Sequence, residues 1–316
     1  MKKILLILLI LGCLEPVLRG QNQDTILMPS MAAPSYRSLF FTDPAKGFAV
    51  GTHGALIQTN DRGSSWQMIN PGSQVDLHSV FFTDFNNGFI TGARGTILKT
   101  SDGGQTWTQQ NTGVPNDLNS VYFIDTYNGF AVGENVMLRT TDGGGSWLPV
   151  AFGPTNFYSV FFTTLDTGYI VAGDGSILKS VNRGMNWSYI YRLSGNALYS
   201  LCFTGHKTAF ASGAKGVILK TTDEGRKWTA LNTGTTVSLF NIFFVSPATG
   251  FAVGEDGVII KTTDGGNSWI LQNSYTTNDL FSVWFSDEYF GVVIGNWGMI
   301  ERTDDGGDYW TIMNKP

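Results

Sequence analysis

The chain has 316 residues, of which 42% are hydrophobic and 14% are charged, and its formal net charge is −5. A mildly acidic chain argues against nucleic acid as the partner, because proteins that bind nucleic acids carry a basic face. The two cysteines, Cys13 and Cys202, exclude a disulfide framework, and the apolar run around Cys202 predicts a buried, inert thiol.

The first residues carry the pattern of an export signal. The basic start Met1–Lys3 is followed by the apolar stretch Ile4–Leu14, which is too short to cross a bilayer as a helix. We expect residues 1–20 to be a signal peptide and the mature protein to be exported to the periplasm, the cell surface or the medium. A second interpretation takes Ile10 to Cys13 as a lipobox, which would make the protein a lipoprotein anchored at Cys13.

Residues 21–35 belong to no repeat and are predicted to form an N-terminal arm, whereas residues 36–316 consist of repeats. An eight-residue stretch, Thr100 to Trp107 in its clearest copy, occurs seven times and ends in a tryptophan each time. Consecutive tryptophans lie 40 or 41 residues apart: Trp66, Trp107, Trp147, Trp187, Trp228, Trp269 and Trp310. A period this regular over the whole chain is typical of a repeat architecture.

The repeated stretch has the chemistry of a hairpin turn. Its aspartate can accept hydrogen bonds from the backbone one or two residues on, its glycine supplies a positive φ, and its tryptophan can cover the turn. The aspartates are Asp61, Asp102, Asp142, Asp223, Asp264 and Asp305. The fourth copy has Asn182 instead of aspartate and Asn186 instead of serine or threonine, so we expect it to be the weakest turn.

Between the turns, every repeat has the same four short apolar segments. In the second repeat they are Ser79–Phe82, Gly88–Gly92, Thr96–Lys99 and Trp107–Gln110. Four short strands in about 41 residues make one propeller blade, so the sequence predicts an all-β fold: a single seven-bladed β-propeller with four antiparallel strands per blade. An open solenoid would need capping repeats with a polar outer face, and none is visible. No shared blade is visible either, and the arm is a candidate for fastening the ring.

The repeated turn resembles the Asp-box, or BNR, repeat of sialidases, sortilin-type receptors, xyloglucan-degrading enzymes and the photosystem II stability/assembly factor family. The run from Gly250 to Trp269 is most similar to the last of these families. The resemblance implies that the turn joins the third and fourth strands of each blade. It also implies a non-enzymatic scaffold that holds another protein during assembly.

An enzyme would need a constellation that the sequence does not provide. The arginines are scattered over different strands and turns, and the repeated aspartates lie in equivalent turns of separate blades, where bracing of the turn explains them. His53, His78 and His206 are isolated, so we expect no metal and no cofactor. A carbohydrate-binding or glycoside-hydrolase-like propeller is the alternative function.

The mouth of the channel is the predicted binding site. The residue just before each predicted first strand occupies an equivalent place around it: Arg37, His78, Asn119, Tyr158, Tyr199, Phe240 and Phe281. The first three form a polar arc and the last four an aromatic arc, with Arg94 and Trp297 in turns on the same face. Aromatic rings along one arc suit a protein or peptide partner, or a glycan, bound by a monomer. Packing of these rings against the neighbouring blade is the other interpretation.

Overall fold

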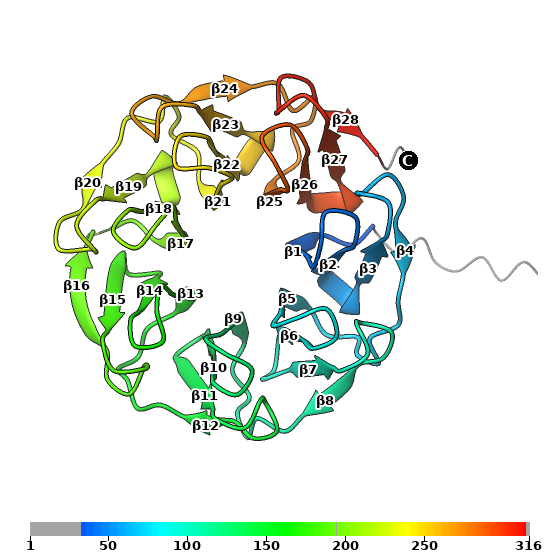
Figure 1. Ribbon diagram of the computed structural model, residues 1–316, viewed down its shortest axis with the longest axis vertical. Helices are drawn as coiled ribbons and strands as arrows, with labels where there is room; N and C mark the ends of the chain where they lie inside the picture. Colours follow the sequence, from blue (N-terminus) through cyan, green and yellow to red (C-terminus); the bar gives the residue numbers. More distant parts are fainter. Residues whose placement is uncertain (1–32, 194, 314–316) are drawn as a thin grey trace, which may run out of the picture. The chain divides into compact units, whose positions relative to one another are not determined.

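The computed structural model describes residues 33–193 and 195–313. The predicted signal peptide, the lipidation of Cys13 and most of the predicted arm therefore lie outside the described residues. Twenty-eight strands form seven four-stranded antiparallel sheets, and four three-residue 3-10 turns are the helical elements of the described part. The predicted seven-bladed β-propeller is confirmed, and Figure 1 shows its sheets around a ring with the first strand of each sheet innermost.

The strands have the following bounds. Blade 1 contains β1 (Tyr36–Phe41), β2 (Gly47–Gly51), β3 (Leu56–Thr59) and β4 (Gln67–Met68), and blade 2 contains β5 (Leu77–Phe82), β6 (Gly88–Gly92), β7 (Ile97–Thr100) and β8 (Thr108–Gln110). Blade 3 contains β9 (Leu118–Phe123), β10 (Gly129–Gly133), β11 (Val136–Thr140) and β12 (Leu148–Pro149), and blade 4 contains β13 (Phe157–Phe162), β14 (Gly168–Ala172), β15 (Ser176–Ser180) and β16 (Ser188–Arg192). Blade 5 contains β17 (Leu198–Phe203), β18 (Ala209–Gly213), β19 (Ile218–Thr221) and β20 (Thr229–Ala230), and blade 6 contains β21 (Leu239–Phe244), β22 (Gly250–Gly254), β23 (Ile259–Thr262) and β24 (Ile270–Gln272). Blade 7 contains β25 (Leu280–Phe285), β26 (Gly291–Gly295), β27 (Ile300–Thr303) and β28 (Thr311–Ile312). The 3-10 turns are η1 (Thr52–Gly54), η2 (Ala214–Gly216), η3 (Glu255–Gly257) and η4 (Asn296–Gly298).

The repeated turn joins the third and fourth strands, and its aspartate braces it. The Asp102 carboxylate accepts hydrogen bonds from the Thr106 amide at 2.9 Å and from the hydroxyls of Thr100 and Thr106 at 2.8 and 2.5 Å. These bonds lower the pKa of Asp102 to about 2, and the bond from the Thr106 hydroxyl contributes most. The Asn182 side chain accepts bonds from the Ser180 hydroxyl and the Asn186 amide, both at 3.0 Å. The side chains of Asp223 and Asp305 also accept two such bonds, so the weakness expected of the fourth copy stays a prediction.

A glycine in the turn lets the neighbouring blades approach each other. Gly104 has φ +87°, and a Cβ there would lie 2.5 Å from the ring of Phe48 in the second strand of blade 1. Trp107 donates from Nε1 to the Gly104 carbonyl at 3.1 Å and packs edge-on against Phe82 of its own blade. The turn, its tryptophan and the preceding blade therefore form one packed unit.

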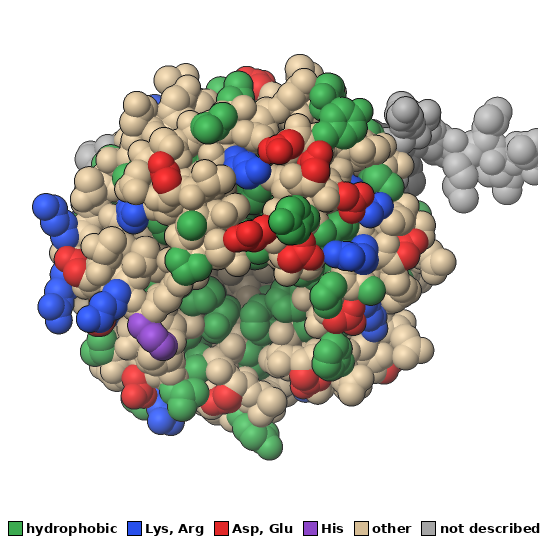
Figure 2. Space-filling model, turned by 45° about the horizontal axis from the view of Figure 1, so that its top comes forward, with side chains coloured by type: hydrophobic (Ala, Val, Ile, Leu, Met, Phe, Trp, Pro, Cys, Tyr) green, Lys and Arg blue, Asp and Glu red, His purple; other side chains and the backbone are tan. Residues whose placement is uncertain are grey.

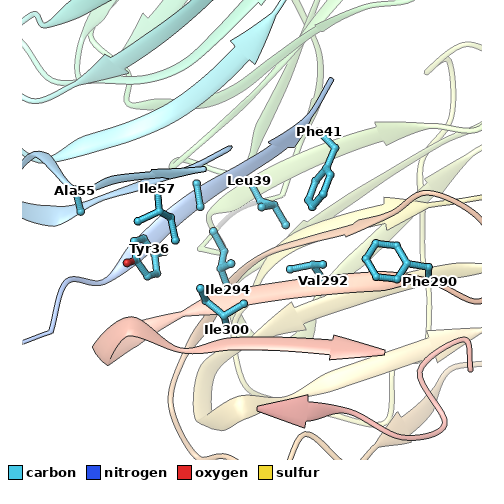
Figure 3. Packing of buried hydrophobic residues seen from close by; sticks show 10 residues of the cluster. Tyr36, Leu39, Phe41, Ala55, Ile57, Phe290, Val292, Ile294 and Ile300 are labelled. Atoms are coloured by element: carbon cyan, nitrogen blue, oxygen red, sulfur yellow. The ribbon is translucent and has the colours of Figure 1, made fainter. Parts of the chain in front are cut away.

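The ring closes without a shared sheet, because each blade is built from one continuous stretch of chain. Blades 1 and 7 bury a common hydrophobic cluster, and Figure 3 shows Leu39 and Phe41 of β1 facing Val292 and Phe290 of blade 7. Phe41 also stacks on Trp284 with ring centroids 4.0 Å apart.

Polar contacts also join these two blades. The Gly298 amide donates to the Pro34 carbonyl at 2.7 Å, and Arg62 pairs with Asp287 at 3.3 Å. Of the arm that was a candidate for fastening the ring, Pro34 thus supplies one hydrogen bond, while residues 21–32 are outside the described part.

Candidate functional site

The residues predicted to lie just before the first strands lie inside them. β5 begins at Leu77 and β17 at Leu198, so His78 and Tyr199 are second residues of their strands. That prediction of the strand start was wrong because each first strand contains an irregularity. The pairing passes from Leu77↔Gly92 to Ser79↔Thr91, so that His78 is an extra residue without a partner in β6.

All seven first strands show this β-bulge at the same position. The extra residues are the seven predicted mouth residues: Arg37, His78, Asn119, Tyr158, Tyr199, Phe240 and Phe281. A bulge re-aims the side chain of its extra residue and frees that residue from the alternation of the strand. The fold therefore holds seven side chains in equivalent positions, and the bulge does not require a particular residue type at any of them.

The four aromatic mouth residues form one continuous row, which we call the aromatic arc (Tyr158, Tyr199, Phe240 and Phe281). Ring centroids are 5.3 Å apart between Tyr158 and Tyr199, 5.6 Å between Tyr199 and Phe240, and 5.1 Å between Phe240 and Phe281. All four side chains are half-buried. The rings therefore pack against each other across three blade boundaries and still expose part of their surface.

The other three mouth residues form the polar arc (Arg37, His78 and Asn119). The Arg37 guanidinium lies over the Phe281 ring, 4.6 Å from its centroid, and joins the two arcs. Asn119 Nδ2 donates to the Phe157 carbonyl at 2.8 Å, and His78 Nδ1 lies 3.2 Å from the Leu118 carbonyl. Burial lowers the pKa of His78, which favours the neutral imidazole. His78 and Asn119 are thus tied to the next blade, whereas Arg37 is exposed.

Arg94 and Trp297 lie at the tips of the turns between second and third strands. Both are exposed and have positive φ values of 56° and 57°. The Arg94 amide donates to the Asp117 carboxylate at 2.9 Å, so this turn contacts the segment that leads into the next first strand. Arg94 also lines an open groove of about 580 Å³ with residues 109–115 on the outer part of blade 2. Arg94 and Trp297 therefore lie on the same face as the mouth but outside the bulged strands.

Two further layers of side chains, which we call the second and third tiers, follow the mouth along the first strands. The sequence did not predict either of them. One residue after each bulge is a serine, or Asn241 in blade 6, and the side chains of Ser38, Ser120, Ser200 and Asn241 accept a hydrogen bond from the next first strand. The Val80 amide donates to Ser38 Oγ at 3.2 Å and the Val283 amide to Asn241 Oδ1 at 3.1 Å. Because the serine occurs at the same place in six repeats, its periodicity was the available signal.

The third tier is a ring of half-buried apolar side chains two residues further along each chain segment: Phe40, Phe81, Tyr122, Phe161, Cys202, Phe243 and Trp284. Neighbouring rings touch, with centroids 5.1 Å apart between Phe81 and Tyr122 and between Tyr122 and Phe161. Figure 2 shows hydrophobic side chains in the wall of the central hollow. The channel wall is therefore apolar below the serine tier.

Blade 5 departs from this arrangement at two linked positions. Six blades begin their second strand with glycine, and a Cβ at Gly168 would lie 2.6 Å from the Phe162 ring. Blade 5 has Ala209 there, and Phe203 is only half-buried and lies 5.2 Å from Phe161. The equivalent separations in other blades are 5.9, 6.4 and 6.1 Å. Phe203 has thus moved toward the space that the small Cys202 side chain leaves.

Cys202 was predicted to be buried, and the structure shows it half-buried in the channel wall, because it is the smallest side chain of the third tier. It is free and lies among apolar side chains, and burial raises its pKa to about 11. Such a thiol is a poor nucleophile. Among the described residues, no group of three His, Cys, Asp or Glu side chains could hold a metal ion, and no helix of that part is long and apolar enough to cross a membrane.

The fold and its mouth define a class of protein: a β-propeller of seven uniform blades whose variable side chains gather at one end of the channel. Within this class the chain belongs to the family described as photosynthesis system II assembly factor YCF48, since the sequence model of that family matches residues 64–155 and 221–315. No curated protein matched the chain.

Several solved structures are similar in fold. A structure described as YCF48 bound to D1 peptide has a TM-score of 0.72 and 19% sequence identity, covering 86% of this chain and 92% of that one. YCF48 from Cyanidioschyzon merolae has a TM-score of 0.71 and 17% identity, covering 87% and 97%. The GH74 xyloglucanase from Xanthomonas campestris has a TM-score of 0.76 and 11% identity, covering 90% of this chain and 55% of that one.

Proposed function

We propose that the protein is an exported, non-enzymatic scaffold that binds an extended segment of a partner protein across the channel mouth. The observation that carries this proposal is the aromatic arc, four touching and half-buried rings aimed by equivalent β-bulges. Membership of the YCF48 family and the similar fold of a propeller described as bound to a peptide support it.

The arc has the chemistry of a binding surface for an extended chain. Tyrosine and phenylalanine offer a large contact area and lose little conformational freedom on binding, and here the rings are already held by their neighbours. Tyr158 and Tyr199 add hydroxyl groups that can bond to a peptide backbone. The protein would act as a monomer, because a single mouth presents the whole arc.

The double change Tyr158→Ala with Tyr199→Ala tests this proposal. We expect the affinity for a partner captured by the wild-type protein to fall at least tenfold, which corresponds to about 1.4 kcal/mol, while the melting temperature changes little. The matched control is Tyr127→Ala with Tyr289→Ala, because both of these tyrosines are highly exposed in turns between first and second strands. That control should leave binding unchanged.

Two outcomes would contradict the proposal. If the double variant lost stability without losing affinity, the arc would be part of the core and not a binding surface. If a glycan array gave specific binding that the same double variant abolished, and protein capture gave none, the ligand would be a carbohydrate, as in the alternative drawn from the sequence.

A further inference from the structure

We infer that the segment bound at the aromatic arc is basic, with arginine or lysine side chains lying over the rings of Tyr158, Tyr199 and Phe240. This inference rests on the proposed function and specifies the chemistry of its partner.

The arc already holds one cation. Arg37 lies over Phe281 with its guanidinium carbon 4.6 Å from the ring centroid, within the distance at which the π face attracts a cation. Within residues 33–193 and 195–313, no other lysine or arginine lies over the remaining three rings of the arc. These three rings are half-buried, so their free surface is available to a ligand cation.

Carboxylates lie beside the arc. Glu255, in η3 of blade 6, accepts a hydrogen bond from the Ser238 amide at 2.9 Å, two residues before Phe240. Burial is the main cause of the raised pKa of Tyr199, and the charges of Tyr158 and Glu255 raise that pKa further. The negative charge of Glu255 therefore acts on the arc. Asp256 follows Glu255 and is exposed at a positive φ of 55°.

Two further carboxylates lie near the arc, one in blade 4 and one before the first strand of blade 7. Asp174 is exposed in blade 4, next to Gly173, where a Cβ would lie 3.0 Å from the Tyr158 ring. Asp279 precedes Phe281 and accepts hydrogen bonds from the Asp256 amide and from Asn296. At the turns between second and third strands of blades 4 to 7, as described, Lys215 is the one base, and the three acids are Asp174, Glu255 and Asp256. Aromatic faces beside excess negative charge favour a cationic ligand.

The polar arc gives such a ligand a direction. Arg37 and Arg94 are exposed cations of blades 1 and 2, and the carboxylates of Asp76 and Asp117 lie beside the same arc, so its charge is close to balance. The basic part of the segment therefore lies toward blades 4 to 6, where the carboxylates are in excess, and its neutral part toward blades 1 and 2.

Fluorescence anisotropy with labelled decapeptides tests the inference. The peptides share a glycine and serine framework and carry arginine, glutamine or glutamate at three alternating positions, one face of an extended chain. The arginine peptide should bind the full protein more tightly than the glutamine peptide and much more tightly than the glutamate peptide, and added salt should reduce the difference.

Two variants locate the charge effect. Glu255→Gln keeps an acceptor for the Ser238 amide and removes the charge, so it should weaken the arginine peptide roughly threefold to tenfold, as expected for one partly exposed charge and its cation. Glu288→Gln, at an exposed turn on the opposite face, is the matched control and should have no effect. Both variants should keep the wild-type melting temperature.

The outcomes separate this inference from the proposed function. The glutamine or glutamate peptide could bind as tightly as the arginine peptide, and the Tyr158 and Tyr199 double variant could lose this binding. That result would overturn the inference of a basic ligand but support the peptide site. Equal weakening by Glu255→Gln and Glu288→Gln would also overturn it, because the attraction would then be unspecific. If the double variant still bound the arginine peptide, both the basic ligand and the proposed peptide site would be overturned.

Discussion

The repeated turns and the channel mouth arise from the same seven repeats but vary in opposite ways. Six of seven turns keep the aspartate, because the carboxylate must accept hydrogen bonds from its own backbone and hydroxyls. At the mouth, the β-bulge places a residue without prescribing its side chain, and the seven blades use arginine, histidine, asparagine, tyrosine and phenylalanine. Residues whose side chains complete a backbone motif are uniform, and residues that the backbone merely positions are free to serve a ligand.

The largest test of this comparison uses two tryptophans. Trp107 of the repeated turn is buried against Phe82 and Gly104, whereas Trp297 on the face of the mouth is 63% exposed. Trp107→Ala should lower the free energy of unfolding by about 3–5 kcal/mol, as the loss of a buried aromatic ring does. Trp297→Ala should leave it nearly unchanged. Urea unfolding of both variants measures the difference, and equal losses would contradict the distinction between frame and mouth.

A second test concerns a departure inside the uniform frame. Glu301 in β27 is fully buried, and both its carboxylate oxygens lack a hydrogen-bond partner among the described residues. The equivalent residues of the other blades are Ile57, Leu98, Leu138, Leu178, Leu219 and Ile260. Burial raises the pKa of Glu301 to about 8, so the folded protein holds this proton more tightly than the unfolded chain.

The consequence for stability has a definite sign. Between the unfolded pKa of 4.5 and the folded pKa of about 8, the folded state binds more protons, so stability should fall as the pH rises, by at most about 1.4 kcal/mol per pH unit. Glu301→Gln should remove this slope, and Glu301→Leu should also stabilise the protein at pH 8. Unfolding by urea at pH 5, 6, 7 and 8 measures the slope. An unchanged slope in the glutamine variant would assign it to other groups.

The smallest expected effect is the coupling between Cys202 and Ala209 in blade 5. Cys202→Phe alone should destabilise the protein, because Phe203 already leans into that space at 5.2 Å from Phe161. Adding Ala209→Gly would let Phe203 return to the position that its counterparts occupy over glycine. The coupling energy should be favourable and about 0.5–3 kcal/mol in a double-mutant cycle. Additive losses would show that the two departures are independent.

The sequence predicted the frame because its constraints are local. The turn aspartate, the glycine and the tryptophan act within eight residues, and their period counts the blades. It also identified the seven mouth residues as equivalent, although it placed them before the strand. The bulge was not visible, since whether His78 pairs with β6 depends on the partner strand and not on His78 itself. The movement of Phe203 was equally hidden, because it follows from a methyl group on Ala209 six residues later.

Each blade is built from one continuous stretch of chain, so no chain segment connects blade 7 to blade 1 across their junction. A short length of chain tethers each of the other neighbouring pairs, so that separated faces quickly meet again. Blades 1 and 7 lack such a tether and rely on the buried cluster of Phe41 and Val292 with a few polar contacts. Opening motions of the disc should therefore concentrate there. The contact of Arg37 with Phe281 crosses the same junction at the mouth. A ligand that contacts both residues would bridge this junction, and its binding free energy would stabilise the closed ring.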